Sequence, residues 1–182
     1  MHEIEVKARV QDVVTLKNIL VTKGIHLNDP SLQCDTIYIA GPWEQVKNDL
    51  DRIIMRIREQ TGRAVLTLKK NGSNELHSIE HETPITHPKE MHGMLVLMGY
   101  QPFIEVKKKR QKAKVDDIEL CLDEVEGLGW FIEAERLLED GGEAEKVQEE
   151  LFIFLEEFGI SKEDQETNGY DTLMRIKRES GQ

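Results

Sequence analysis

The chain has 182 residues, of which 38% are hydrophobic and 32% charged, a composition typical of one globular domain with an aliphatic core. No apolar run approaches the roughly 18 residues of a membrane-spanning helix and no secretory leader opens the chain, so we expect no membrane partner and a cytoplasmic location. The 24 basic residues are outnumbered by 35 acidic ones, and the formal charge of −11 disfavours a nucleic acid partner.

The first predicted element is a strand over residues 3–10, in which charged and apolar residues alternate. Strict alternation places the charged residues on one face of the strand and the apolar residues on the other. The charged face carries Glu3, Glu5, Lys7 and Arg9. A helix is predicted over residues 12–23, because its apolar residues share one face and Gly24 suits the left-handed position after a helix.

Three further strands are predicted over residues 53–59, 65–69 and 77–82, and each again has a charged face. These faces carry Arg56, Arg58, Lys69, Glu80 and Glu82. The next predicted element is a helix over residues 88–98, where Pro88 suits the first turn.

The last predicted strands cover residues 104–109, 118–123 and 130–135. In the first of them, Ile104 and Val106 are expected on the apolar face. The alternating residues, among them Lys107 and Lys109, are then expected on the charged face. The charged residues of these strands that we single out are Lys107, Lys109, the following Arg110, Asp123, Glu133 and Glu135. A helix is then predicted over residues 143–158. A capping box formed by Ser161 and Asp164 predicts a short helix after Ser161, and a further helix is predicted over residues 170–177.

An internal repeat relates the two halves of the chain. Residues 2–7 read His-Glu-Ile-Glu-Val-Lys and residues 77–82 read His-Ser-Ile-Glu-His-Glu, and each stretch is followed by a helix that ends in glycine. The sequence therefore predicts a single domain over 1–182, built from two related strand–helix–strand units at about 2–74 and 77–140, plus C-terminal helices.

Charge alternation in a single strand usually means that one face packs on a core and the other meets water. Here the charges are also sorted by sign, into acidic pairs such as Glu3/Glu5 and basic pairs such as Arg56/Arg58. Like charges two residues apart repel unless opposite charges or a ligand face them. A sheet curled into a barrel with its charged face inward would meet that condition, offering carboxylates to Mg²⁺ or Mn²⁺ and cationic side chains to phosphate.

An ordered set of motifs resembles the CYTH superfamily, the triphosphate tunnel metalloenzymes. The set begins with Glu3-x-Glu5-x-Lys7 and continues with Arg56-x-Arg58, Thr67-x-Lys69, Glu80-x-Glu82, the run Lys107–Arg110, Asp123 and the stretch from Gly127 to Glu135. The resemblance covers about residues 2–176. It implies an α+β fold in which a closed or nearly closed eight-stranded antiparallel β-barrel has a charged interior and helices packed outside.

The resemblance also implies a role for each of these positions. Mg²⁺ or Mn²⁺ would be bound by Glu3, Glu5, Glu133, Glu135 and Asp123, the last either as a ligand or as an orienting group. The triphosphate would be held by Lys7, Arg9, Arg56, Arg58, Lys69, Lys107, Lys109 and Arg110, with Glu80 and Glu82 completing the acidic side. Lys7 and Arg58 are the predicted catalytic residues, and Lys7 is either a general base, if neighbouring cations lower its pKa, or a static phosphate clamp.

The implied reaction has three forms. The first is that of a class IV adenylate cyclase, which converts ATP to cyclic AMP and pyrophosphate. The second is hydrolysis of thiamine triphosphate, a nucleoside triphosphate or inorganic tripolyphosphate, and the third is binding of a nucleotide or polyphosphate without turnover. The resemblance also allows a homodimer.

Overall fold

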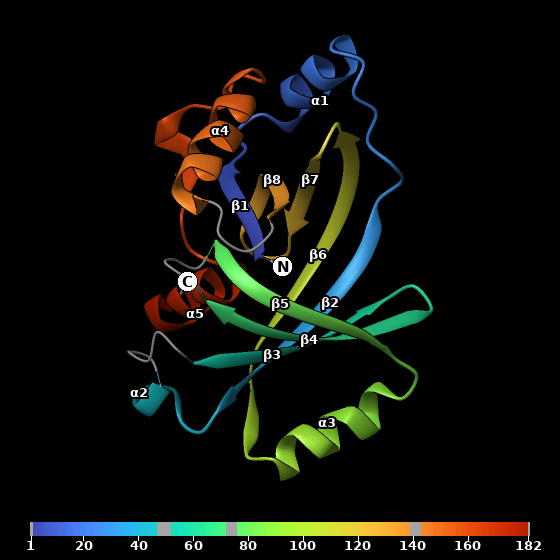
Figure 1. Ribbon diagram of the computed structural model, residues 1–182, viewed down its shortest axis with the longest axis vertical. Coiled ribbons are helices and arrows are strands. Elements are labelled where there is room, and N and C mark those ends of the chain that lie inside the picture. Colours follow the sequence, from blue (N-terminus) through green and yellow to red (C-terminus); the bar gives the residue numbers. More distant parts are fainter. Residues whose placement is uncertain (1, 47–51, 72–75, 139–142, 182) are drawn as a thin grey trace.

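The computed structural model describes residues 2–46, 52–71, 76–138 and 143–181, which form an α+β fold around one antiparallel sheet (Figure 1). The strands are β1 His2–Arg9, β2 Ser31–Ala40, β3 Ile53–Gln60, β4 Arg63–Asn71, β5 His77–Ile85, β6 Tyr100–Val115, β7 Ile118–Val125, β8 Gly129–Leu138 and β9 Gln165–Glu166. The helices are α1 Val13–Thr22, α2 Trp43–Val46, α3 Pro88–Leu97, α4 Ala144–Glu156 and α5 Tyr170–Ser180, with a 3₁₀ turn at Lys162–Asp164.

The sheet closes on itself. Its strand order is β5-β4-β3-β2-β6-β7-β8-β1, with β9 beside β1, and an additional antiparallel pairing joins β1 to β5. Glu3 lies opposite Ser78 at this seam. The closed eight-stranded barrel and the helices packed outside it confirm the predicted fold class.

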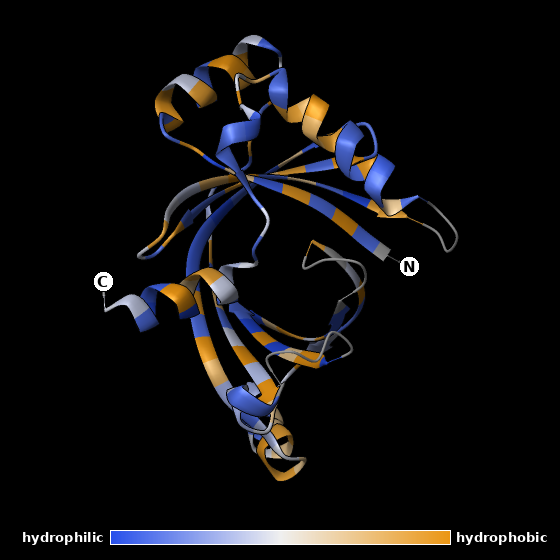
Figure 2. Ribbon diagram, turned by 90° about the vertical axis from the view of Figure 1, so that its left-hand side faces the viewer, coloured by the Kyte–Doolittle hydropathy of each residue, from blue (hydrophilic) through white to orange (hydrophobic). Residues whose placement is uncertain are grey.

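The larger core lies outside the barrel wall, between the strands and two helices. The apolar faces of β1, β7 and β8 pack against α1 and α4, with Leu16, Leu151 and Phe152 among the buried residues. A smaller cluster formed by Tyr38, Ile57 and Leu95 fixes α3 to the outer face of β2 and β3. Figure 2 shows the alternation of hydrophilic and hydrophobic residues along the strands that makes this two-faced wall possible.

A second core lies inside the barrel and is apolar. Ile37, Ile54, Ile104 and Val106 point inward and are buried together with Phe131, Tyr170 and Leu173. The last two of these belong to α5, which lies against β6 and covers this part of the interior (Figure 1). The interior is therefore divided into an apolar part filled by side chains and a charged part that remains hollow.

The inner apolar core overturns one prediction, the orientation of β6. Ile104 and Val106 face the interior, so the residues that follow them inward are Lys108 and Arg110, while Lys107 and Lys109 face outward. The prediction was wrong because it assumed that apolar residues always face away from the charged interior. The orientations predicted for the charged residues of β3, β4, β7 and β8 are confirmed.

The predicted helices are also present. The three at residues 12–23, 88–98 and 143–158 correspond to α1, α3 and α4, and the capping box of Ser161 and Asp164 starts the 3₁₀ turn. The C-terminal helix extends three residues beyond its predicted end, to Ser180. None of the helices in the described ranges is long and apolar enough to cross a membrane.

Candidate active site

The hollow part of the barrel is a cavity of about 280 Å³. All eight long strands contribute side chains to it, and acidic and basic groups occur in near-equal number. Its charged lining comprises Glu3, Glu5, Lys7, Asp35, Arg52, Arg56, Arg58, Lys69, Glu80, Glu82, Lys108, Arg110, Lys112, Glu119, Glu133, Glu135 and Asp171. The inward faces predicted from the sequence therefore do converge on one cavity.

Lys7 lies among carboxylates at one wall of the cavity and is 2% exposed. Its Nζ is 3.4 Å from Glu5 Oε1 and 3.3 Å from Glu133 Oε1. Burial alone would lower the pKa of Lys7, but these two carboxylates outweigh it and raise that pKa above its ordinary value. The condition for Lys7 to serve as a general base, a pKa lowered by neighbouring cations, is not met.

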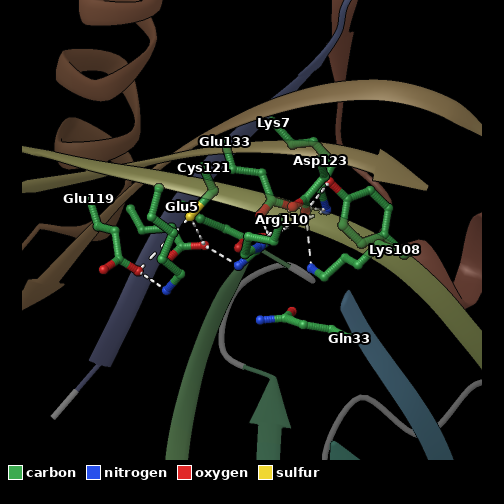
Figure 3. A network of polar contacts seen from close by, with 12 residues as sticks. Glu5, Lys7, Gln33, Lys108, Arg110, Glu119, Cys121, Asp123 and Glu133 are labelled. Atoms are coloured by element: carbon green, nitrogen blue, oxygen red, sulfur yellow. Dashed lines mark hydrogen bonds and ion pairs between the residues drawn. The ribbon is translucent and has the colours of Figure 1, made fainter. Parts of the chain in front are cut away.

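Asp123 organises the neighbouring basic residues. It is fully buried and accepts hydrogen bonds from Lys108 Nζ at 3.0 Å and from Arg110 Nε at 2.8 Å (Figure 3). The Tyr170 hydroxyl donates to the same carboxylate at 3.0 Å. Arg110 also contacts Glu133 and thus joins this group to the Lys7 corner. Because three donors already occupy Asp123, we interpret it as an orienting group and not as a metal ligand.

The opposite wall carries Arg56, Arg58 and Lys69, each of which is paired with an acid. Arg58 makes two hydrogen bonds of 2.7 Å to Asp35, whose pKa burial would raise but the paired guanidinium holds well below its usual range. Arg56 contacts Glu82 at 3.1 Å, and Lys69 contacts Glu80 at 3.2 Å. These cations are pre-positioned by carboxylates, which is what an anion site needs if it is to bind without reorganisation.

Three carboxylates of the cavity lie close enough to share a cation. Oxygen atoms of Glu5, Glu133 and Glu135 all lie within 4.8 Å of one another. Burial raises the pKa of Glu135 to about 8, and Glu133 adds to the rise despite the nearby Arg110. Burial, Glu80 and Glu5 likewise raise the pKa of Glu3 to about 7. Crowded acid groups of this kind fit a hard divalent cation, which prefers oxygen ligands and would relieve their repulsion.

A second group of possible ligand atoms shares Glu135 with the first. It adds Glu119 and the buried thiol of Cys121, again within 4.8 Å. A thiol is a soft ligand, whereas Mg²⁺ and Mn²⁺ prefer carboxylate oxygens. We therefore place the candidate metal site at the first group, where Glu5, Glu133 and Glu135 converge.

Three residues predicted to hold phosphate lie away from the cavity. The side chains of Lys107 and Lys109 are 49% and 59% exposed on the outer face of β6, where they pair with Glu105 and Glu124. Arg9 is 41% exposed at the end of β1 and pairs with Glu166 at 2.8 Å. The predicted tunnel position of these three residues is wrong, in the first two cases because of the orientation of β6. The structure does bring together the remaining predicted residues, although Asp123 lies behind the basic side chains.

Several residues of the cavity are not predicted from the sequence. Lys108 was not predicted because the orientation of β6 was wrong, and the opposite orientation of that strand would have placed its side chain in the cavity. Asp35 lies on β2, a strand for which no charge alternation was noted, and Tyr170 comes from a helix far along the chain. No sequence signal places the last of these in the tunnel, because only the tertiary fold brings α5 to the barrel interior.

Comparisons with known proteins agree with this geometry. The sequence model of the CYTH domain matches residues 1–170. MJ0240 of Methanocaldococcus jannaschii, provisionally named an adenylate cyclase, is 29% identical over 166 residues, 90% of this chain and 93% of that protein. The solved structure of PH1819 from Pyrococcus horikoshii is 26% identical with a TM-score of 0.78, covering 96% of this chain and 99% of that one.

A plant protein shares the fold at lower similarity. HpAC1 from Hippeastrum, provisionally named an adenylyl cyclase and described as having a dominant triphosphatase activity, is 23% identical with a TM-score of 0.60. The match covers 93% of this chain and 91% of that one. With the family match extending over most of its length, the chain belongs to the CYTH-domain family.

Proposed function

We propose that the protein is a metal-dependent enzyme that acts on a triphosphate inside the barrel, with conversion of ATP to cyclic AMP and pyrophosphate as the leading reaction. The observation that carries this proposal is the convergence of carboxylates and cations from all eight long strands on one cavity. Charged groups buried around an otherwise empty space need charged ligands, and a metal–triphosphate complex offers both signs. The name of MJ0240 supports the cyclase form.

Basic residues from three strands would bind the phosphate chain. Arg56, Arg58 and Lys69 come from β3 and β4, and Lys108 and Arg110 come from β6, which β2 separates from β3. The cavity volume of about 280 Å³ is at the small end of ligand sites, which run roughly from 300 to 1,000 Å³. We therefore place the phosphates inside the cavity and the organic group of the substrate at its mouth.

Glu5, Glu133 and Glu135 would hold Mg²⁺ or Mn²⁺, with Glu3 beside them. The bound ion would neutralise phosphate charge and act as a Lewis acid. The role of the chain is to fix these carboxylates: Glu133 contacts both Lys7 and Arg110, and Arg110 also contacts Glu135 at 3.3 Å.

Lys7 and Lys108 differ in their readiness to release a proton. The pKa of Lys7 is raised by its carboxylate neighbours, so we assign it the role of phosphate clamp. The pKa of Lys108 is lowered by burial and by the adjacent Arg110. Its Nζ nevertheless donates a hydrogen bond to Asp123, so we assign the Lys108 ammonium group to the phosphates as well.

Hydrolysis is the second candidate, because the related fold of HpAC1 belongs to a protein described as a triphosphatase. In cyclisation the ribose 3′-hydroxyl attacks the α-phosphorus, the bond to the β-phosphate oxygen breaks and pyrophosphate leaves. In hydrolysis, water attacks the γ-phosphorus, the bond to the oxygen that bridges to the β-phosphorus breaks, and the diphosphate leaves while orthophosphate forms. The two reactions share the cation-lined cavity and differ in which phosphorus faces the nucleophile.

Product analysis tests the proposal. Purified protein with Mg²⁺ or Mn²⁺ is incubated with ATP, thiamine triphosphate and tripolyphosphate. Cyclic AMP with pyrophosphate supports the leading reaction, and orthophosphate supports hydrolysis. The Glu5→Gln variant should lose most turnover, while Glu124→Gln, which changes a carboxylate on the outer face, should match the wild type. Equal activity in both variants, or binding without any product, would contradict the proposal.

A further inference from the structure

One residue joins the C-terminal helix to the ionic network of the cavity. Tyr170 is the first residue of α5 and is 9% exposed. Its ring packs edge-on against Phe131, with centroids 5.1 Å apart, and so belongs to the inner apolar core. Its hydroxyl donates to Asp123 Oδ2 at 3.0 Å. Burial and the nearby acids raise the pKa of this phenol well above its ordinary value, so the hydroxyl remains a donor.

The ring of Tyr170 also contacts two ammonium groups. Lys7 Nζ lies 4.2 Å from the ring centroid, and Lys108 Nζ lies 4.8 Å from it. Both distances are within the range of cation–π attraction, which is strongest where water is excluded. A lysine side chain has a flexible four-carbon stem, so contacts at its Nζ decide where the charge lies.

The segment before Tyr170 adds to the hold on Lys7. The carbonyl of Asn168 accepts a hydrogen bond from Lys7 Nζ at 3.4 Å. Two residues earlier, Glu166 belongs to β9, which pairs with β1 beside Lys7 itself. The C-terminal segment is thus anchored to the same strand whose lysine it contacts.

We infer that Tyr170 is a positioning residue of the active site, which sets the places of the Lys7 and Lys108 ammonium groups and of the Asp123 carboxylate in the tunnel. The expected effect of Tyr170 on turnover rests on the proposed function. Its effect on where these side chains lie does not. Tyr170 is the last residue matched by the CYTH-domain model, so the helix that it begins lies beyond the matched region.

The competing explanation is that Tyr170 merely fills the inner core. Leu173 provides the matched control, because it lies on the same helix, is 7% exposed and packs in the same cluster. Within the described residues, it has no contact with the ionic network. A change at Leu173 weakens the docking of α5 without removing the ring or the hydroxyl. Effects specific to Tyr170 therefore report on the network and not on packing.

Nitrogen-15 NMR of the lysine ammonium groups tests the inference without any need for turnover. The signals of Lys7 and Lys108 are identified by their absence in Lys7→Arg and Lys108→Arg. In the wild type and in Leu173→Ala we expect both ammonium groups to exchange slowly with water. In Tyr170→Leu both should exchange at least about tenfold faster, in line with the loss of a desolvated cation–π contact.

A second pair of variants covers the case in which Tyr170→Leu does not fold. Tyr170→Phe keeps the ring and removes only the hydroxyl, and tetrafluorophenylalanine at the same position keeps the ring shape but weakens its attraction for cations. We expect faster exchange of both lysines in the fluorinated protein than in Tyr170→Phe. Unchanged exchange in Tyr170→Leu or in the fluorinated protein would overturn the inference, and so would an equal increase in Leu173→Ala.

Kinetics with the triphosphate turned over by the wild type give the functional arm. Tyr170→Leu should lower kcat roughly tenfold or more, with a smaller change in KM, since the lysines act on the reacting phosphates. Leu173→Ala should retain the wild-type kcat. If the wild type turns over none of the triphosphates, the proposed function fails while the exchange measurement still decides the role of Tyr170. If the wild type is active and Tyr170→Leu keeps its kcat, the inference fails alone.

Discussion

The buried pair of Asp35 and Arg58 predicts that a charge of the tunnel contributes to stability, in addition to the role in binding that we propose for Arg58. Both side chains are largely buried, and their two hydrogen bonds are 2.7 Å long. Removing one member leaves the other charge buried without its partner, which typically costs about 3–5 kcal/mol. Arg58→Ala should therefore lower the free energy of unfolding by an amount in that range, as measured by urea denaturation. Lys109→Ala on the outer face should change it by less than about 1 kcal/mol.

The same pair predicts a loss of stability in acid. The pKa of Asp35 is depressed in the folded protein, so its ionised form stabilises the fold at pH values above the ordinary carboxyl pKa of about 4. This contribution is lost as the pH falls through that value toward the lower folded pKa. The stability difference between wild type and Asp35→Asn should thus be large at pH 7 and shrink between pH 4 and 2. A difference that stays constant across urea titrations at these pH values would contradict this assignment.

Two adjacent lysines on β6 allow a residue of the tunnel to be compared with a residue of the outer surface. Lys108 is 4% exposed and contacts Asp123, whereas the side chain of Lys109 is 59% exposed and contacts Glu124. Lys108→Met should reduce kcat on the order of 10²-fold, the usual effect of losing one charged group that stabilises a transition state. Lys109→Met should leave kcat unchanged. Equal losses in the two variants, measured by initial rates, would show that the position of Lys108 in the tunnel is not what matters.

At the scale of elements, charge alternation predicted most of the barrel wall. It correctly assigned the inward faces of β1, β3, β4, β7 and β8, because on these strands the outward residues are apolar and contact helices or other strands. It failed on β6, where Ile104 and Val106 face inward toward α5. Which side of a strand is apolar depends on what fills the interior, and the sequence of one strand does not carry that information.

The helix α4 illustrates the opposite case, in which sequence periodicity was sufficient. The spacing of Val147, Leu151 and Leu155 places them on one side of a helix, and all three are buried against the outer face of the barrel. Leu151 is fully buried, so Leu151→Ala should lower the free energy of unfolding by about 2–5 kcal/mol. Thermal or urea unfolding checks this value, and Ile153→Ala on the exposed side of α4 is the matched control. A loss below about 1 kcal/mol would mean that α4 packs loosely.

On the scale of the whole molecule, the proposed function requires a protein of net charge −11 to bind an anion. The cavity gathers basic groups from four strands and screens them from the acidic surface, so the local charge decides what binds. Near-equal numbers of acidic and basic groups line the cavity, which favours a triphosphate that arrives with divalent cations over a free polyanion.

The element order β1–α1–β2 is repeated as β5–α3–β6.

Some whole-molecule predictions remain predictions. The relationship between the two units at about 2–74 and 77–140 is one of them, and both unit ends fall on or next to segments outside the described residues. The homodimer and the cytoplasmic location are the others. Gel filtration with light scattering at several protein concentrations would decide the first of these two.

The most direct measurement is a crystal structure with Mn²⁺ and a non-hydrolysable triphosphate analogue, recorded with anomalous scattering from manganese. We expect an anomalous peak within ligand distance of carboxylate oxygens of Glu5, Glu133 or Glu135. We also expect phosphate oxygens in contact with Arg58 of β3 and Lys108 of β6. Phosphates bound instead along the outer lysines Lys107 and Lys109, with the barrel interior containing only water, would contradict this expectation.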